Sequence, residues 1–341
     1  MRRPARLGLA IAVLVVAVFG AYTALWFVAA GRIEGGVAQF AQSLHAQNLD
    51  LAWRAIRVGG FPLALRVEMS EARLRGHATT PASEVEAPLL SASARPWNPL
   101  VWQVAAPDGL SAAGTLAGGA IAKLTARRAS GTVAVASKGG ATVWLNIGEL
   151  ESEGSVHLAA RDADLWLIVP PHPPQSDTEP DIGLALDVRA LSLPAVPAPF
   201  TNPLDEFALG MTVMGKIPSA PLREAAAAWR DSGGTLELNH LALRWGALRV
   251  TGSGTLALDP DLQPIGAFSG VIEGYQVLMS ALVAAGRMRA GDAQLARLAL
   301  AMLAKAGPDG RPEIATSLTM QNGEMYLGPV KLGKAPRIAW K

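Results

Sequence analysis

The amino-acid sequence predicts a mainly β protein, with one or more antiparallel, strongly curved sheets and a few peripheral helices, preceded by one N-terminal transmembrane helix. Three observations lead to this prediction. The chain begins with a long uncharged segment, most of the remainder alternates between apolar and polar residues, and residues that favour turns separate the alternating segments.

The N-terminal segment is long enough to cross a bilayer. Residues 7–30 form a run of 24 residues without a charged side chain, and at the helical rise this run exceeds a hydrocarbon core of about 30 Å. Arg2, Arg3 and Arg6 precede the run, which by the positive-inside rule places the N-terminus in the cytoplasm. We therefore expect a single-pass protein of a bacterial inner membrane.

The same segment allows a second interpretation, a cleaved signal peptide, because Val28-Ala29-Ala30 has the small residues that such a site needs. The length of the segment favours a retained anchor, residues 1–30, rather than a cleaved signal peptide. A juxtamembrane amphipathic helix is expected over residues 31–48, where Ile33, Val37, Phe40 and Leu44 recur at helical spacing. Under either interpretation the main domain, residues 49–341, is periplasmic.

Alternation with a period of two dominates the main domain and predicts half-buried strands. Because strands of a parallel sheet are buried on both faces and form unbroken apolar runs, this alternation favours antiparallel pairing. Across Asn239-His240 the apolar positions change parity, which predicts a tight turn or a bulge. The alternating segments are residues 63–69, 143–147, 163–169, 182–188, 207–213 and 248–258.

Pro-rich and helical segments interrupt this pattern. Residues 170–181 are rich in proline, which cannot donate to a central ladder, so they predict an exposed linker or long loop and the best candidate for an internal domain boundary. Helices are expected over residues 221–229, 275–289 and 292–306, and the last two would form a hairpin that plugs one end or face of the sheet. On the last helix Leu295, Leu298 and Met302 share one face.

Composition excludes several classes of function. Without Arg2, Arg3 and Arg6 the chain has 27 basic and 28 acidic residues. The main domain therefore lacks the basic field that nucleic-acid binding requires. The chain has no Cys, which excludes disulfides and thiolate metal sites. We expect no nucleic acid partner and no cofactor.

No group of residues predicts catalysis. The five His residues are scattered and lack metal-binding spacing. Glu149, Glu151 and Glu153, with Asp162 and Asp164, have no ordered calcium-loop spacing, so we interpret them as solvated charges rather than a metal site. Gly252-Ser253-Gly254 lacks the flanking glycines of a nucleotide loop or a nucleophile elbow and is expected to mark sharp curvature or close backbone approach within a strand. The expected protein is not an enzyme.

Nine Trp residues outnumber seven Phe and three Tyr, which is typical of a sheet anchored by indole rings. Most of these rings are interpreted as core packing, with the alternative that several line an apolar groove. Among the Trp residues weighed in this way are Trp53, Trp97, Trp102, Trp144, Trp166, Trp229 and Trp245.

Three segments carry a family resemblance: Gly60-Phe61-Pro62, then Arg95-Pro96-Trp97-Asn98-Pro99 ahead of Trp102, then Leu243-Arg244-Trp245-Gly246 followed by Gly252-Ser253-Gly254. In this order behind an N-terminal anchor, they resemble an uncharacterised bacterial envelope family, the domain of unknown function twenty-one twenty-five, over most of the chain. The strand pattern is also similar to the AsmA-type envelope proteins, whose curved sheets carry an apolar inner trough. That second similarity implies lipid handling by analogy, and the first family implies no catalytic residues.

Two functions follow as hypotheses. The first is a membrane-anchored, non-enzymatic protein that binds or transfers lipid or another hydrophobic ligand in a groove of the sheet. The second is an envelope scaffold or accessory subunit that binds a protein partner. The residues expected to line the groove are Leu65, Val67, Leu145, Leu167, Leu186, Leu209 and Leu256.

Overall fold

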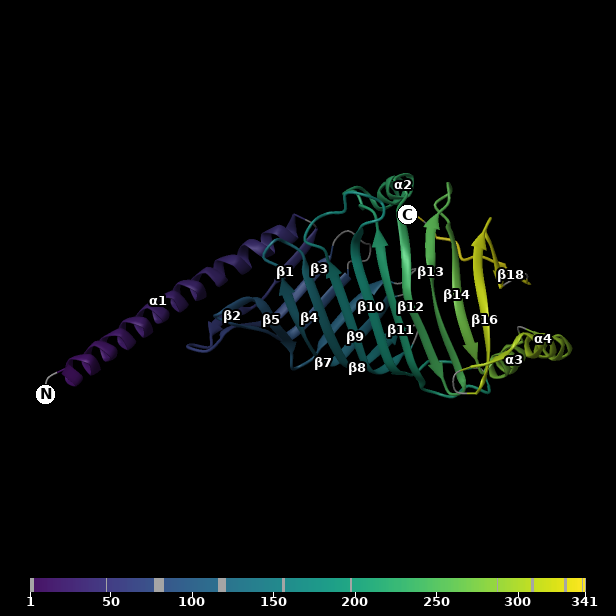
Figure 1. Ribbon diagram of the computed structural model, residues 1–341, viewed down its shortest axis with the longest axis horizontal. Helices are drawn as coiled ribbons and strands as arrows, with labels where there is room; N and C mark the ends of the chain where they lie inside the picture. The colour runs from purple at the N-terminus through teal and green to yellow at the C-terminus, as the bar shows by residue number, and fades with distance from the viewer. Residues whose placement is uncertain are drawn as a thin grey trace. The chain divides into compact units, whose positions relative to one another are not determined.

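Alternating residues form strands throughout the body of the protein, as the sequence predicts. The computed structural model is mainly β, with eighteen strands and four helices among the residues that it describes, and the strand pairings found there are antiparallel. The chain divides into two compact units, unit 1 (residues 1–134) and unit 2 (residues 135–341). Figure 1 labels their elements. The structure describes residues 3–46, 48–76, 83–115, 121–154, 157–196, 198–286, 288–307, 310–327, 330–338 and 340, with the side chains of 3–16, 115, 121–122, 299, 327 and 330–332 left out.

Unit 1 begins with one continuous helix, α1 (Arg3–His45). The predicted span and the predicted amphipathic segment are therefore parts of the same helix. Residues 7–16 of the predicted span lie outside the described side chains. Among the residues whose side chains are described, no helix combines the length and the hydropathy that crossing a membrane requires.

The strands of unit 1 form a sheet around two long central strands, β3 and β4. One edge of β3 pairs with β1 and β2, and its other edge pairs with β4. β4 then pairs with β5 and β6, which both pair with β7. The strands are β1 (Leu49–Ala52), β2 (Ala55–Gly59), β3 (Leu65–Gly76), β4 (Ser83–Arg95), β5 (Asn98–Ala106), β6 (Leu110–Thr115) and β7 (Ile121–Val135).

Unit 2 is a meander, in which each strand pairs with the strands before and after it. The pairing runs from β8 to β14, continues to β16 and ends with β17 and β18, while the short β15 pairs with β16. The strands are β8 (Ala141–Gly154), β9 (Ala159–Val169), β10 (Pro180–Leu191), β11 (Leu204–Met214), β12 (Thr235–Trp245), β13 (Leu248–Leu258), β14 (Pro264–Glu273), β15 (Lys305–Ala306), β16 (Pro312–Gln321), β17 (Glu324–Leu327) and β18 (Val330–Lys334).

Two irregular features of the sequence are explained by this meander. The parity change across Asn239-His240 is a bulge, because the register of β12 shifts between Leu238 and Leu241 against β13, which confirms that prediction. The Pro-rich residues 170–179 form the loop between β9 and β10, which pair directly with each other.

Glycines let β13 and β14 approach closely. A Cβ atom on Gly254 would lie 2.4 Å from the carbonyl oxygen of Ala267, which is too close for any real contact. Gly252-Ser253-Gly254 is therefore part of a strand, in which only glycine fits at position 254, as the sequence predicts.

A substitution tests this close approach. Gly254→Ala is expected to lower the free energy of unfolding by about 2 kcal/mol, because the added methyl group forces two backbones apart. Gly183→Ala in β10 is the matched control, since its Cβ would lie 3.5 Å from the Cβ of Ile168, an ordinary contact. The urea midpoint of the full chain in detergent micelles, followed by Trp fluorescence, measures both. Equal midpoints for the two variants would contradict the prediction.

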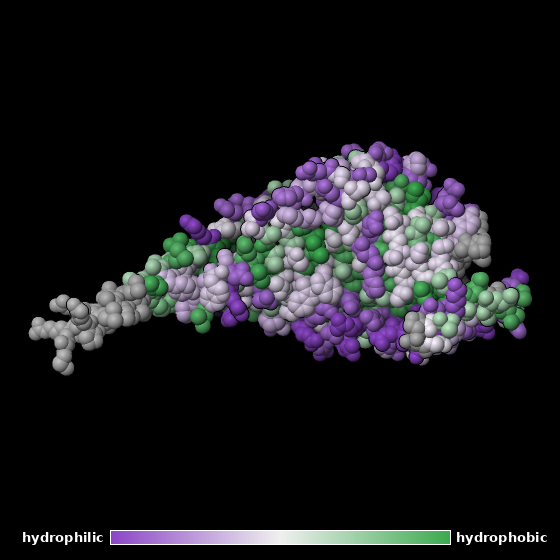
Figure 2. Space-filling model, viewed as in Figure 1, coloured by the Kyte–Doolittle hydropathy of each residue, from purple (hydrophilic) through white to green (hydrophobic). Residues whose placement is uncertain are grey.

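The helices of unit 2 are α2 (Leu222–Asp231), α3 (Tyr275–Ala284) and α4 (Ala290–Leu303). α3 and α4 form the predicted hairpin and contact each other. However, the shared face of α4 does not plug the sheet, because Leu295, Leu298 and Met302 are 69%, 62% and 88% exposed. α4 instead buries Ala293, a small residue. Figure 2 shows green, apolar residues at the end where Figure 1 places α4.

Candidate functional site

The predicted groove residues of unit 2 lie on one face of the meander. Leu145 on β8 is opposite Leu165 on β9, which is opposite Leu186 on β10, and Leu186 is opposite Leu209 on β11. The row continues to Leu241 on β12. Because cross-strand partners point to the same side, these five leucines define what we call the apolar face of unit 2.

Neighbouring rows extend this face. Leu167 lies two residues from Leu165 on β9 and is opposite Leu184 on β10. Leu256 on β13 is opposite Leu236 on β12, which is itself opposite Val213 on β11. The structure thus brings five of the seven predicted residues onto a common face. These leucines are only half-buried, and within the described part of unit 2 no second sheet packs over them.

The other two predicted residues belong to unit 1. Leu65 and Val67 lie on β3 and are both 4% exposed. They pack in the interior of unit 1, where Val67 is opposite Val58 on β2 and Ala92 on β4.

An apolar cavity lies where α2 covers the apolar face. Its volume is about 250 Å³, somewhat below the roughly 300–1,000 Å³ of typical small-ligand pockets. The indole N–H of Trp229 donates to the carbonyl oxygen of Met214 at 2.8 Å, and the indole N–H of Trp340 donates to the carbonyl oxygen of Leu262 at 2.7 Å. Both rings therefore present carbon surface to the cavity. The cavity is lined by Val213, Ile217, Leu222, Ala225, Ala226, Trp229, Leu236, Leu256, Leu258 and Trp340.

Only some of the residues that line this cavity were predicted from the sequence. Leu256 is a predicted groove residue, and Trp229 is one of the Trp residues for which groove lining is the alternative to core packing. No pattern in the sequence points to Trp340 or Ile217. Helical spacing offers a signal for the α2 wall, since Leu222, Ala225 and Trp229 recur on one face of the helix. At the rim Leu222 is 69% exposed and Ile217 is 41% exposed, so the cavity opens to the outside of unit 2.

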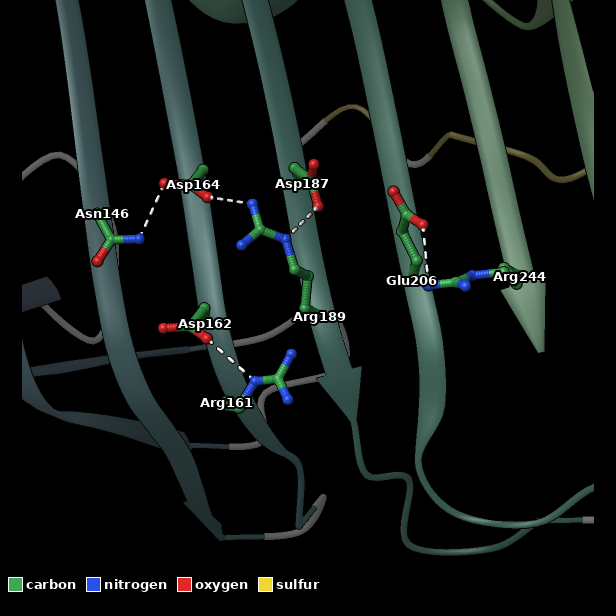
Figure 3. A network of polar contacts seen from close by, with 8 residues as sticks. All are labelled: Asn146, Arg161, Asp162, Asp164, Asp187, Arg189, Glu206 and Arg244. Atoms are coloured by element: carbon green, nitrogen blue, oxygen red, sulfur yellow. Dashed lines mark hydrogen bonds and ion pairs between the residues drawn. The ribbon is translucent and has the colours of Figure 1, made fainter. Parts of the chain in front are cut away.

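The opposite face of the same strands is charged, and Figure 3 shows its side chains projecting from neighbouring strands. Asp164 is 6% exposed and accepts hydrogen bonds from Asn146 Nδ2 and Arg189 Nη2, each at 2.9 Å. Further along, Arg244 Nη2 lies 3.4 Å from Glu206 Oε2. We call this side, with Asn146, Asp164, Asp187, Arg189 and Glu206, the polar face of unit 2.

On the polar face, ionisation of the Asp187 carboxyl is disfavoured. Its Oδ1 is buried without a hydrogen bond among the described residues, and it lies 3.7 Å from Arg189 Nε. Burial raises the pKa of Asp187 above its ordinary value of 3.8, opposed by the charge of Arg189 and reinforced by Glu206 and Asp164.

This raised pKa predicts a pH dependence. Below the ordinary value of 3.8 the carboxyl is protonated in both the folded and unfolded chain, and its burial costs little. As pH rises through the folded-state pKa, ionisation destabilises the fold. Asp187→Asn is therefore expected to be as stable as the natural chain at low pH and more stable at neutral pH, as urea midpoints across that range would measure. A stability difference that is independent of pH would contradict this assignment.

The described residues contain no group of three His, Cys, Asp or Glu side chains placed to hold a metal ion. The acidic residues of β8 and β9 are dispersed by their local geometry. Glu149 adopts a φ of 54°, which interrupts the alternation of β8, and Asp164 is engaged with Arg189.

The profile of one bacterial protein family matches the chain. The family is described as "Uncharacterized protein conserved in bacteria (DUF2125)", and the match covers residues 26–336. No curated protein and no solved structure matches the chain.

Proposed function

The chain belongs to the uncharacterized bacterial family DUF2125, and from its sequence and fold we propose that it is a membrane-anchored, non-enzymatic periplasmic protein. On this proposal α1 crosses the inner membrane through residues 7–30 with its N-terminus in the cytoplasm. The apolar face of unit 2 then binds or transfers the acyl chains of a lipid or another hydrophobic ligand.

The observation that carries the proposal is the unbroken apolar face. A row of leucines crosses five strands and leads to a cavity whose lining is apolar and aromatic. Soluble domains rarely leave a contiguous apolar surface of this kind uncovered unless it binds something. A strongly curved sheet would wrap that face around a chain-like ligand, whereas the polar face keeps the outer side in water.

Photo-crosslinking tests this proposal. The full chain is reconstituted in vesicles of phosphatidylethanolamine and phosphatidylglycerol that contain a phospholipid with a diazirine on its acyl chain. After illumination, mass spectrometry is expected to find lipid adducts on the apolar residues of β11–β13 and α2.

Two variants of β11 separate the faces. Leu209→Gln is expected to reduce these adducts about tenfold, corresponding to about 1.4 kcal/mol of lost apolar contact. Ala208→Gln, on the opposite face of the same strand, is the matched control and should leave the yield unchanged. An absence of adducts on unit 2, or equal losses in the two variants, would rule out lipid binding on this face.

A second function is favoured by the exposed side of α4. Leu295, Leu298 and Met302 form an uncovered apolar stripe at helical spacing, which is typical of a helix that docks on a protein partner. An envelope scaffold is the function that this stripe favours. Loss of a co-purifying protein in Leu298→Glu, with lipid adducts on unit 2 unchanged, would support the scaffold over the lipid-binding function.

A further inference from the structure

The loop between β2 and β3, residues 60–64, packs against α1 within unit 1. Phe61 is the centre of the contact. Its ring lies edge-on to Trp26 with centroids 5.4 Å apart, stacks on Phe27 at 5.8 Å, and meets Phe19 at 6.3 Å. Trp26 is 5% exposed although it lies on the helix predicted to cross the membrane.

Side chains of α1 also donate hydrogen bonds to two carbonyl oxygens of this loop. The hydroxyl of Tyr22 donates to the carbonyl oxygen of Pro62, and the indole N–H of Trp26 donates to that of Ala64 at 3.0 Å. The amide of Ala64 donates to the carbonyl oxygen of Gly60 at 2.9 Å. Pro62 has no N–H that would need a partner. Each pairing of this kind lowers the cost of bringing non-helical backbone into a bilayer.

The outer surface of this contact is apolar. Leu63 at the tip of the loop is 70% exposed and Phe61 is 39% exposed. On α1, Phe27, which stacks on Phe61, is 59% exposed, and Leu25 and Val28 are 73% and 55% exposed. Large apolar side chains are thus exposed on the loop and around this part of α1, and no charged residue occurs on α1 between Phe19 and Val28.

The position of the contact along α1 fixes its depth relative to the first charged residue that follows. Tyr22 precedes Arg32 by ten residues and Trp26 precedes it by six, which at the helical rise correspond to about 15 Å and about 9 Å. Arg32 is exposed, as are Arg57 and Arg66 on the strands that lead into and out of the loop. These guanidinium groups would meet lipid phosphates while the loop lies deeper.

From these observations we propose that residues 60–64 are a membrane-inserted loop, whose partner is the acyl-chain region of the periplasmic leaflet of the inner membrane. This inference rests on the anchor in the function proposed above. The loop leads directly into Leu65 and Val67 of β3, so its insertion would hold the first long strand of unit 1 at the bilayer surface.

The lack of Cys in the chain allows a direct test with single labels. Leu63→Cys is labelled with an environment-sensitive fluorophore in the full chain and reconstituted in phosphatidylethanolamine and phosphatidylglycerol vesicles. Because Leu63 is exposed, the substitution removes little packing. The label is expected to emit as in an apolar medium, to be quenched by lipids with a nitroxide on the acyl chain, and to resist aqueous iodide.

Two matched labels complete the experiment. Asp108→Cys, in the exposed turn after β5, should be quenched by iodide alone. Val18→Cys, within the predicted span and 61% exposed, should be quenched by the acyl nitroxide alone. If position 18 is in lipid but position 63 behaves like position 108, the loop proposal fails and the anchor stands. If positions 18 and 63 are both in water, the anchor and the loop proposal fail together.

A further variant tests the backbone pairing. Trp26→Phe keeps a ring against Phe61 but leaves the carbonyl oxygen of Ala64 without its donor. Insertion would then expose an unpaired carbonyl to lipid, so the label at position 63 is expected to become more accessible to iodide. Unchanged quenching in this variant would overturn the role assigned to Trp26.

Discussion

Replacement of Arg189 by Met is expected to lower the free energy of unfolding by about 3 kcal/mol. Asp164 is 6% exposed, and Arg189 Nη2 is the cationic group that donates to it at 2.9 Å. Removing one partner of a buried pair leaves an uncompensated charge, which costs about 3–5 kcal/mol. We expect a loss at the lower end of this range because the Arg189 side chain is itself 44% exposed. Urea unfolding of the full chain in detergent micelles measures the loss.

The control for this effect is Arg161→Met. Arg161 pairs with its sequence neighbour Asp162 on β9, but its side chain is 67% exposed, so the loss should stay below about 1 kcal/mol. Adding Asp164→Asn to Arg189→Met should recover part of the loss, because the orphaned charge is removed. Equal losses in the two arginine variants would show that burial of Asp164 does not determine the energetics of this face.

Replacement of Trp229 by Ala should have an effect of similar or larger size, about 3–5 kcal/mol. Trp229 packs with Leu258 and Leu262 in the core cluster beneath α2 and forms a wall of the apolar cavity. Its removal would enlarge that cavity and detach α2 from β11–β13. Thermal unfolding followed by circular dichroism measures the loss.

Trp229→Phe separates packing from hydrogen bonding at this position. The variant keeps an aromatic ring but removes the donor to the carbonyl oxygen of Met214, which should cost about 1 kcal/mol. A loss as large as that of the alanine variant would mean that the hydrogen bond, rather than the buried ring, holds α2 on the sheet.

The strands of unit 2 could be predicted because their apolar positions carry large side chains. Large apolar residues recur at every second residue over most of β8–β11 and at both ends of β13, where they are distinct from their polar neighbours. The bulge at Asn239-His240 is also visible in the sequence, as a change of parity. In β4, β6 and β7 the alternating positions are mainly Ala, Ser, Gly and Thr, which differ little in hydropathy. These strands form because neighbouring strands offer them edges, β3 to β4, β4 to β6 and β5 to β7, which is a tertiary effect.

The candidate site was likewise predictable from the sequence only in part. Period-two parity placed Leu145, Leu186 and Leu209 on one face, since parity alone determines the side of a sheet. Parity contains no information about what covers that side. The contacts of Trp340 with the cavity and of Phe61 with α1 join residues far apart in sequence, and no periodicity along the chain encodes such contacts.

The nearest-neighbour pairing of unit 2 has a consequence for how such a protein can change in length. Each strand from β9 to β14 pairs with two flanking strands of unit 2, so folding needs mainly short loop closures between successive hairpins. Insertion or loss of one hairpin would leave the direction and face of every other strand unchanged. Each added pair of strands would widen the sheet by about 9.6 Å. Unit 2 is thus built so that the width of its apolar face can be adjusted in steps of one hairpin, without redesign of the parts already present.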